Sequence, residues 1–127
     1  MANQKFSKEH EWVLVEGNIA TIGVSDYAQK ELGDIVYVEL PEAGDKFEKG
    51  ETCSNIESVK AVNDIYTPIS GEIVEVNEKL EESPELVNKD ASKEGWILKI
   101  KMSKPDEVEE LMDETQYNEY LKGISEE

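Results

Sequence analysis

The chain has 127 residues, of which 38% are hydrophobic and 34% are charged. This length and composition argue against a disordered chain and predict a single domain over residues 1–127 with one hydrophobic core. Thirty acidic and thirteen basic residues give a net charge of −17, which disfavours binding to nucleic acid and to anionic membranes, because both need a basic surface.

Cysteine and histidine are each present once. A lone Cys53 cannot form an intramolecular disulfide, and His10 without any Cys/His ligand spacing excludes a histidine-based metal site. No apolar run approaches the roughly 20 residues of a membrane helix, and the first residues lack the features of a secretory or transit peptide. We therefore expect a reducing compartment: the cytoplasm for a bacterial chain, or the mitochondrial matrix for a mature eukaryotic form.

The first elements are a hairpin and a helix. Residues 12–15 and 18–24 read as two strands around a turn at Gly17. A short helix near 25–33 follows, because Ser25 suits the N-cap position and Gly33 suits the residue after the last turn.

Five further segments have the β-branched, aromatic or alternating composition of strands. They are residues 35–40, 51–57, 61–67, 71–76 and 96–102. In the last segment the alternation places apolar side chains on one face and lysines on the other. The apolar face is Trp96, Leu98, Ile100 and Met102, and the opposite face is Lys99 and Lys101.

The C-terminal part changes to a helical period. Apolar residues recur at helical spacing in 108–112 and again in 117–121, but the five-residue step between these groups breaks the phase. The pattern predicts two short helices within 104–122, outside a β core that spans about 6–102. Asp113 would cap the second helix and Gly123 would end it.

A weak repeat relates two parts of the predicted core. The segment GDKFEKGE at 44–51 recurs as GEIVEVNE at 71–78. Two such β units suggest a pseudo-twofold sandwich or flattened barrel. Gly50 and Asn77 are equivalent in this alignment, and both residue types tolerate a positive φ, so the repeat predicts similar turns there.

Lys60 lies between the two copies of the repeat. Strand-like residues flank it on both sides, so a hairpin turn near Val59 and Lys60 would place the amine in solvent. A Schiff-base catalyst would instead need a buried lysine, whereas Glu57 and Asp64 nearby favour the ammonium form. An exposed lysine is most often only solvated; the alternative reading is a lysine that a partner enzyme modifies.

Several ordered segments of the chain resemble the H proteins of the glycine cleavage system, a family of lipoyl carriers. The resemblance extends over about residues 6–121. It includes HEWV at 10–13, IGVSDYAQ at 22–29, LGDIVYVELP at 32–41, IESVKA at 56–61 and PELVN at 84–88. The ordered set is far more specific than IESVKA alone.

The resemblance implies a mainly β fold, the barrel-sandwich hybrid of lipoyl and biotinyl domains, with Lys60 on an exposed hairpin. It implies that lipoic acid is joined to Lys60 by an amide bond. It also implies that the chain is a non-catalytic carrier that acts as a monomer. The implied partners are the glycine decarboxylase (P protein), the aminomethyltransferase (T protein), dihydrolipoyl dehydrogenase (L protein) and a lipoate ligase or lipoyl transferase.

The resemblance also assigns roles around the lysine. Glu57, Val59 and Ala61 would be read by the attaching enzyme. Glu11 and Asp64 match positions at which carboxylates line a cleft for the loaded arm, where they would hold an aminomethyl ammonium by charge-assisted hydrogen bonds. The competing interpretation is that both are ordinary acids among the thirty in the chain.

Three related carriers remain as alternatives. A lipoyl domain of a 2-oxo-acid dehydrogenase complex usually has Asp before the modified lysine, where Val59 stands here, and a biotin carrier has Met on both sides. A lipoyl donor in a lipoate relay would use the same lysine, so the sequence does not separate it from the glycine cleavage carrier. Two departures from the family pattern, Glu9 and the pair Ala91-Ser92, lie near the expected cleft and in a loop.

Overall fold

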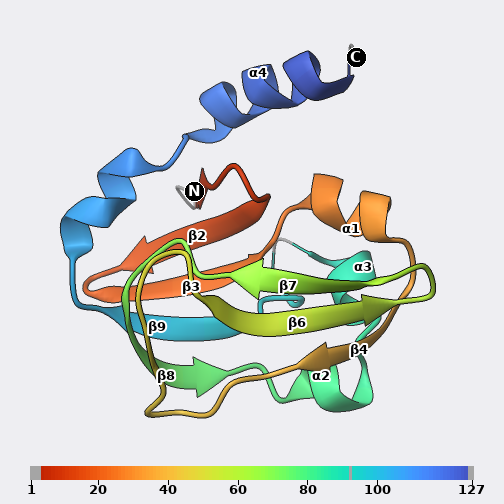
Figure 1. Ribbon diagram of the computed structural model, residues 1–127, viewed down its shortest axis with the longest axis horizontal. Coiled ribbons are helices and arrows are strands. Elements are labelled where there is room, and N and C mark those ends of the chain that lie inside the picture. Colours follow the sequence, from red (N-terminus) through yellow and green to blue (C-terminus); the bar gives the residue numbers. More distant parts are fainter. Residues whose placement is uncertain (1–3, 92, 126–127) are drawn as a thin grey trace.

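The computed structural model describes residues 4–91 and 93–125, and it contains two antiparallel sheets that enclose the core (Figure 1). The first has six strands in the order β1-β2-β3-β9-β8-β5, and the second has three in the order β4-β6-β7. The six-stranded sheet comprises β1 (Gln4–Phe6), β2 (Glu11–Glu16), β3 (Ile19–Val24), β5 (Lys46–Phe47), β8 (Gly71–Val76) and β9 (Leu98–Met102). The three-stranded sheet comprises β4 (Ile35–Glu39), β6 (Thr52–Ser58) and β7 (Val62–Tyr66). The prediction of a mainly β fold is confirmed.

The core lies between the inner faces of the two sheets. Ile22 and Ile100 of the larger sheet and Ile56 of the smaller one are fully buried. In β9, Leu98, Ile100 and Met102 are buried and Lys101 is exposed, so the predicted alternation is confirmed for the strand; Trp96 precedes it and is partly buried. The sequence period of two therefore decided which face β9 turns inward.

Helix α1 (Asp26–Leu32) has the predicted signals at both ends. The Ser25 hydroxyl accepts a hydrogen bond from the amide of Ala28 at 3.1 Å. Gly33 has a φ of +81°, and its amide donates to the carbonyl of Gln29 at 3.0 Å. The glycine thus ends the helix by turning the chain sharply into β4.

The C-terminal segment lies outside the sheets, next to the N-terminal strands (Figure 1). It consists of a 3₁₀ helix, η1 (Pro105–Glu110), and an α-helix, α4 (Glu114–Ser125). Asp113 and Gln116 form reciprocal side-chain-to-amide hydrogen bonds at 2.8 and 2.9 Å, so the predicted cap is confirmed. The predicted end at Gly123 is wrong, because α4 continues to Ser125. Tyr117 anchors α4 by stacking on Phe6 with ring centroids 4.4 Å apart.

Short elements were not predicted, because two to four residues show no usable period. They are β1, β5, α2 (Lys79–Glu82) and α3 (Leu86–Lys89). The turn equivalence suggested by the repeat is also wrong. Gly50 has a φ of +92°, whereas Asn77 does not have a positive φ. Asn77 instead uses its side-chain amide, which donates to the carbonyls of Glu94 and Trp96 at 2.8 Å each.

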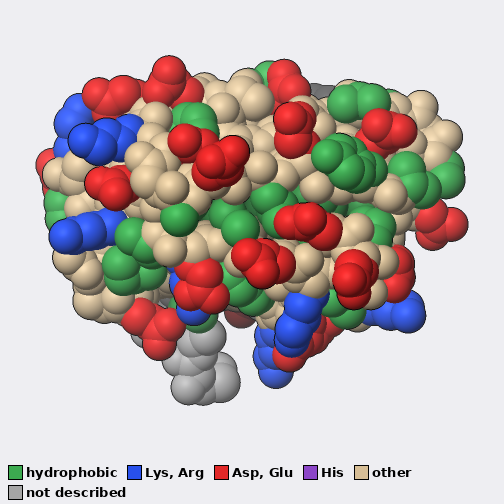
Figure 2. All heavy atoms as spheres, turned by 90° about the horizontal axis from the view of Figure 1, so that it is seen from below, with side chains coloured by type: hydrophobic (Ala, Val, Ile, Leu, Met, Phe, Trp, Pro, Cys, Tyr) green, Lys and Arg blue, Asp and Glu red, His purple; other side chains and the backbone are tan. Residues whose placement is uncertain are grey.

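Figure 2 shows acidic side chains spread over one face of the molecule, with apolar side chains between them and few lysines. Within 4–91 and 93–125, none of the helices combines the length and the apolar composition that crossing a bilayer requires.

Candidate functional site

The hairpin between β6 and β7 has a two-residue turn made of Val59 and Lys60. The Ser58 amide donates to the Ala61 carbonyl at 2.8 Å. The Ser58 hydroxyl accepts from the amides of Lys60 and Ala61, at 3.1 and 3.2 Å. Neither turn residue has a positive φ, so this turn does not need the glycine or asparagine typical of tight hairpins. Instead the serine hydroxyl satisfies the two amides that the turn leaves free.

The predicted placement of Lys60 at an exposed hairpin is confirmed. Lys60, Glu57 and Ala61 are exposed, and Val59 exposes 67% of its surface. The hydrocarbon stem of Lys60 passes over Gly33, since a methyl group added at Gly33 would lie 3.3 Å from Lys60 Cε. The amine is therefore accessible to another protein, while its stem has a defined support.

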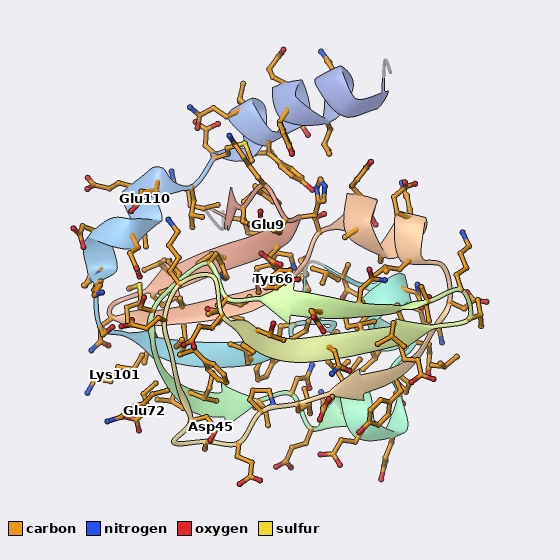
Figure 3. All side chains as sticks on the ribbon, in the orientation of Figure 1. Glu9, Asp45, Tyr66, Glu72, Lys101 and Glu110 are labelled. Carbon is orange, nitrogen blue, oxygen red and sulfur yellow. The ribbon has the colours of Figure 1, made fainter. Side chains whose placement is uncertain are left out.

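Glu11 lies at the opposite end of β7 from the lysine. Its side chain is 2% exposed, accepts a 2.6 Å hydrogen bond from the Ser7 hydroxyl, and is also hydrogen-bonded by the backbone of Tyr66. Burial raises the pKa of Glu11 to about 7, against the opposing effect of the Ser7 hydrogen bond. In Figure 3, Tyr66 lies at the arrowhead end of β7, away from the hairpin.

Asp64 occupies the middle of β7, opposite Asn55 of β6, and is exposed. Among the described residues, no hydrogen bond joins Asp64 to Glu11. The two carboxylates therefore do not form a pair. Asp64 lies on the outer surface of the smaller sheet, whereas Glu11 is buried beside Tyr66, two residues or about 7 Å further along the strand.

Two residues with possible redox or acid–base roles, Cys53 and His10, are held in local packing. Cys53 is 5% exposed, its Sγ donates to the Ile65 carbonyl at 3.5 Å, and burial raises its pKa to about 12, which disfavours the reactive thiolate. His10 Nδ1 lies 2.9 Å from the Tyr117 hydroxyl, and burial lowers its pKa.

The two tryptophans pack against the protein. Trp12 is 2% exposed, and its indole N–H donates to the Ala91 carbonyl at 2.8 Å. Ala91, the first residue of the pair that departs from the family pattern, is itself buried and is therefore held in place. Ser92 lies outside the described residues. Trp96 is partly buried, with the Lys99 ammonium 5.2 Å from its ring centroid.

Sequence reasoning missed Ser58 and Asn88 as parts of this site. The Asn88 side chain bonds the backbone on both sides of Asp34, next to the hairpin, at 2.8 and 2.9 Å. A serine directly before a two-residue turn is a local signal that could have identified Ser58. Asn88 has no local signal, because its backbone partners lie more than 50 residues away.

Comparison with known proteins gives a consistent result. The profile of the family described as "Glycine cleavage H-protein" matches residues 4–124. The chain is 52% identical to the glycine cleavage system H protein of Thermotoga maritima over 120 residues, covering 94% of this chain and 97% of that protein. It is 55% identical to the Staphylococcus epidermidis protein of the same name over 117 residues, covering 92% and 93%.

A solved structure has the same fold. The crystal structure of a glycine cleavage system H protein from Mycobacterium marinum matches with a TM-score of 0.87 and 30% identity, covering 96% of this chain and 98% of that one. The likeness confirms the lipoyl-type barrel-sandwich fold.

The family explains why an exposed lysine, rather than a pocket of reactive groups, is the main feature of the site. Glycine cleavage H proteins carry lipoate covalently on a lysine, work with the P, T and L proteins, and are not catalytic themselves. With the profile, the relatives and the fold in agreement, this chain belongs to the glycine cleavage H-protein family, the lipoyl carriers of the glycine cleavage system.

Proposed function

We propose that Lys60 is the lysine that carries lipoate. The observation that supports this most strongly is its position at the exposed tip of a two-residue turn between two paired strands. An attaching enzyme can therefore reach the amine without unfolding the chain. The β scaffold fixes the point from which the arm starts, while the arm itself can move between partners.

Glu57, Val59 and Ala61 are the residues that a lipoate ligase or lipoyl transferase reads around Lys60. All three are exposed on the hairpin. Val59 supplies an apolar contact directly before the lysine, and Glu57 supplies a charge at the last but one position of β6. Together with Lys60 they give the attaching enzyme a small surface with one cation, one carboxylate and two apolar side chains.

Attachment changes the charge of this surface. Lys60 is the one basic residue between positions 50 and 67, and an amide bond to its nitrogen removes that charge. The bound lipoate supplies a disulfide, which can accept a carbon group and electrons at sulfur. The chain contributes an acidic, rigid surface from which the arm is presented to the active sites of the P, T and L proteins.

Asp64 and Glu11 are the acids proposed to interact with the loaded arm. Asp64 follows Lys60 along the outer surface of β7, so its carboxylate is available to an aminomethyl ammonium by a charge-assisted hydrogen bond. Glu11 lies behind Tyr66 at the end of the same strand. An arm lying along β7 would meet Asp64 first and the Glu11 region last.

The test of this arm path is the lifetime of the loaded aminomethyl group without partner enzymes. Asp64→Asn with Glu11→Gln should shorten it. Glu72→Gln, at an exposed acid on β8 of the other sheet, is the control and should leave it unchanged. An unchanged lifetime in the double variant would make both residues ordinary acids.

We further propose that the chain acts as a monomeric domain over 1–127 in the bacterial cytoplasm. Bacterial relatives of nearly the same length support this setting. A role as lipoyl donor to other proteins would use the same lysine, and it is separated by asking whether lipoate on Lys60 is transferred to a second acceptor protein.

Intact mass after incubation with lipoate, ATP and a lipoate ligase tests the attachment site. The mass should increase by one lipoyl group, and Lys60→Arg should abolish the increase. Lys101→Arg, an exposed lysine on β9 that Figure 3 shows far from the hairpin, is the matched control. An unmodified wild-type chain, with a ligase that is active on another acceptor, would contradict the proposal.

A further inference from the structure

The connection from α1 to β4, residues Gly33, Asp34 and Ile35, forms the support of the lysine hairpin. Each residue contacts the hairpin differently. The Asp34 carbonyl accepts a hydrogen bond from the Val59 amide at 3.0 Å. Ile35 is the cross-strand partner of Ser58, and the Lys60 stem passes over Gly33. In Figure 1 this connection runs beside the tip of the β6–β7 hairpin.

The side chain of Asn88, in α3, holds this support on both sides. Its Oδ1 accepts from the Ile35 amide at 2.8 Å, and its Nδ2 donates to the Gly33 carbonyl at 2.9 Å. Between these two backbone groups lies the carbonyl of Asp34, which accepts the hydrogen bond from the Val59 amide. The side-chain amide of Asn88 therefore fixes Gly33 and Ile35, the two residues on either side of Asp34, to which the hairpin is hydrogen-bonded.

The orientation of the Asn88 amide follows from its neighbours. Gln29 Nε2 donates to the Asp26 carboxylate at 3.0 Å. Because a carboxylate only accepts, the carbonyl end of Gln29 must face Asn88. That oxygen receives the second hydrogen bond of Asn88 Nδ2, at 3.0 Å. Only an amide supplies one acceptor for Ile35 and two donors for Gly33 and Gln29 in this arrangement.

We propose that Asn88 is a positioning residue for the lipoyl lysine: it fixes the Gly33–Ile35 support and thereby the point from which the arm starts. The importance of that point for lipoylation rests on the proposed function of Lys60. Hydrogen bonds in a chain of this kind restrict a surface turn that has few buried apolar contacts. Without the amide, the support loses its bonds on both sides of Asp34, and the turn becomes mobile.

Hydrogen exchange of the Val59 amide, measured by NMR in the unlipoylated chain, tests the structural part. Asn88→Ala should speed this exchange about tenfold or more relative to wild type. Asn77→Ala is the matched control, because Asn77 also donates to two backbone carbonyls but in the loop before β9. Asn77→Ala should lower global stability. After correction for this loss, by dividing the Val59 exchange rate by that of core amides, the Val59 rate should stay within about twofold of wild type.

Kinetics of lipoate attachment test the functional part. For Asn88→Ala the KM of the ligase for the chain should rise about fivefold with little change in kcat, because the ligase must select the ordered form of the turn. Asn77→Ala should keep the wild-type KM. Asn88→Asp retains the acceptor for the Ile35 amide. It replaces the donor to the Gly33 carbonyl and Gln29 Oε1 by a carboxylate oxygen, which repels both. It should therefore change Val59 exchange and KM in the same direction as Asn88→Ala.

Unchanged Val59 exchange and KM in both Asn88 variants would overturn the positioning role, as would equal changes in the Asn77 variant. If the wild-type chain were not lipoylated while Val59 exchange still responded to Asn88→Ala, the proposed function would fail and the hold of Asn88 on the hairpin would stand.

Discussion

The two ends of β7 place ionisable side chains in very different environments. At the beginning, Lys60 precedes the strand at an exposed turn that polar hydrogen bonds hold together. At the end, Glu11 is buried beside Tyr66, and its charge also contributes to the raised pKa of Cys53. The first end is accessible to a modifying enzyme, whereas the second is shielded from solvent.

This difference separates two uses of charge in one carrier. The amine of Lys60, which we propose as the lipoylation site, is kept at the surface, where other enzymes can reach it. A carboxyl that is enclosed by the fold instead makes the stability of the protein depend on pH. Substitutions at the two ends should therefore affect different measurements.

The largest expected effect is a loss of stability on the inner side of the hairpin. Ile56 of β6 is fully buried between the sheets, so Ile56→Ala should lower the free energy of unfolding by roughly 2–5 kcal/mol. Urea denaturation measures this loss. A loss below about 1 kcal/mol would mean that the hairpin contributes little to the core.

The next effect is the pH dependence of stability due to Glu11. The unfolded chain releases this proton near pH 4.5 and the folded chain near pH 7. Stability from this group is thus greatest below pH 4.5, decreases as the pH rises to 7, and is constant above. Glu11→Gln removes the decrease, so the stability of the variant relative to wild type should grow by on the order of 3 kcal/mol between pH 4.5 and 7.

Urea titrations at several pH values measure that change. Glu16→Gln, which alters an exposed acid at the other end of β2, is the control. A constant difference between Glu11→Gln and wild type across this pH range would show that Glu11 is ionised in the folded state as readily as in the unfolded chain.

A smaller effect is expected at the turn itself. Ser58→Ala removes the hydroxyl that accepts from the Lys60 and Ala61 amides, so it should cost about 1 kcal/mol and speed exchange of both amides. Ser103→Ala, at an exposed serine after β9, is the control. Slow exchange of both amides in the Ser58 variant would mean that the strand pairing alone holds the turn.

The smallest effect is expected on the outer side of the same hairpin. Val62 exposes 61% of its surface, so Val62→Ala should change the free energy of unfolding by less than about 0.5 kcal/mol. A loss comparable to that of Ile56→Ala would contradict the assignment of the outer surface of β7 as a free face.

Much of the fold could be predicted because its signals are local. Ser25 and Gly33 mark the ends of α1, and the alternation in β9 marks its buried face. The end of α4 was mispredicted because Gly123 is exposed and meets no steric obstacle in the helix. The strands β1 and β5 were missed because pairing with β2 and β8, rather than composition, makes them strands.

For the site, the hairpin and the exposed position of Lys60 could be predicted from neighbouring residues. That this lysine carries lipoate is implied by the family resemblance and stays a prediction. The burial of Glu11 could not be predicted, because β2 begins with this glutamate and nothing in its sequence indicates that the other sheet covers it. Asp64 was placed correctly on the strand after the lysine, but its separation from Glu11 depends on how the sheets face each other.

The sequence by itself determined the longer strands and the exposed turn with Lys60 in it, because turn formation and strand alternation depend on residues within a few positions. Tertiary structure decided that Glu11 loses its solvent and that Asn88 meets the residues on both sides of Asp34. Desolvation and long-range hydrogen bonds arise only when distant segments pack together, so no local pattern specifies them.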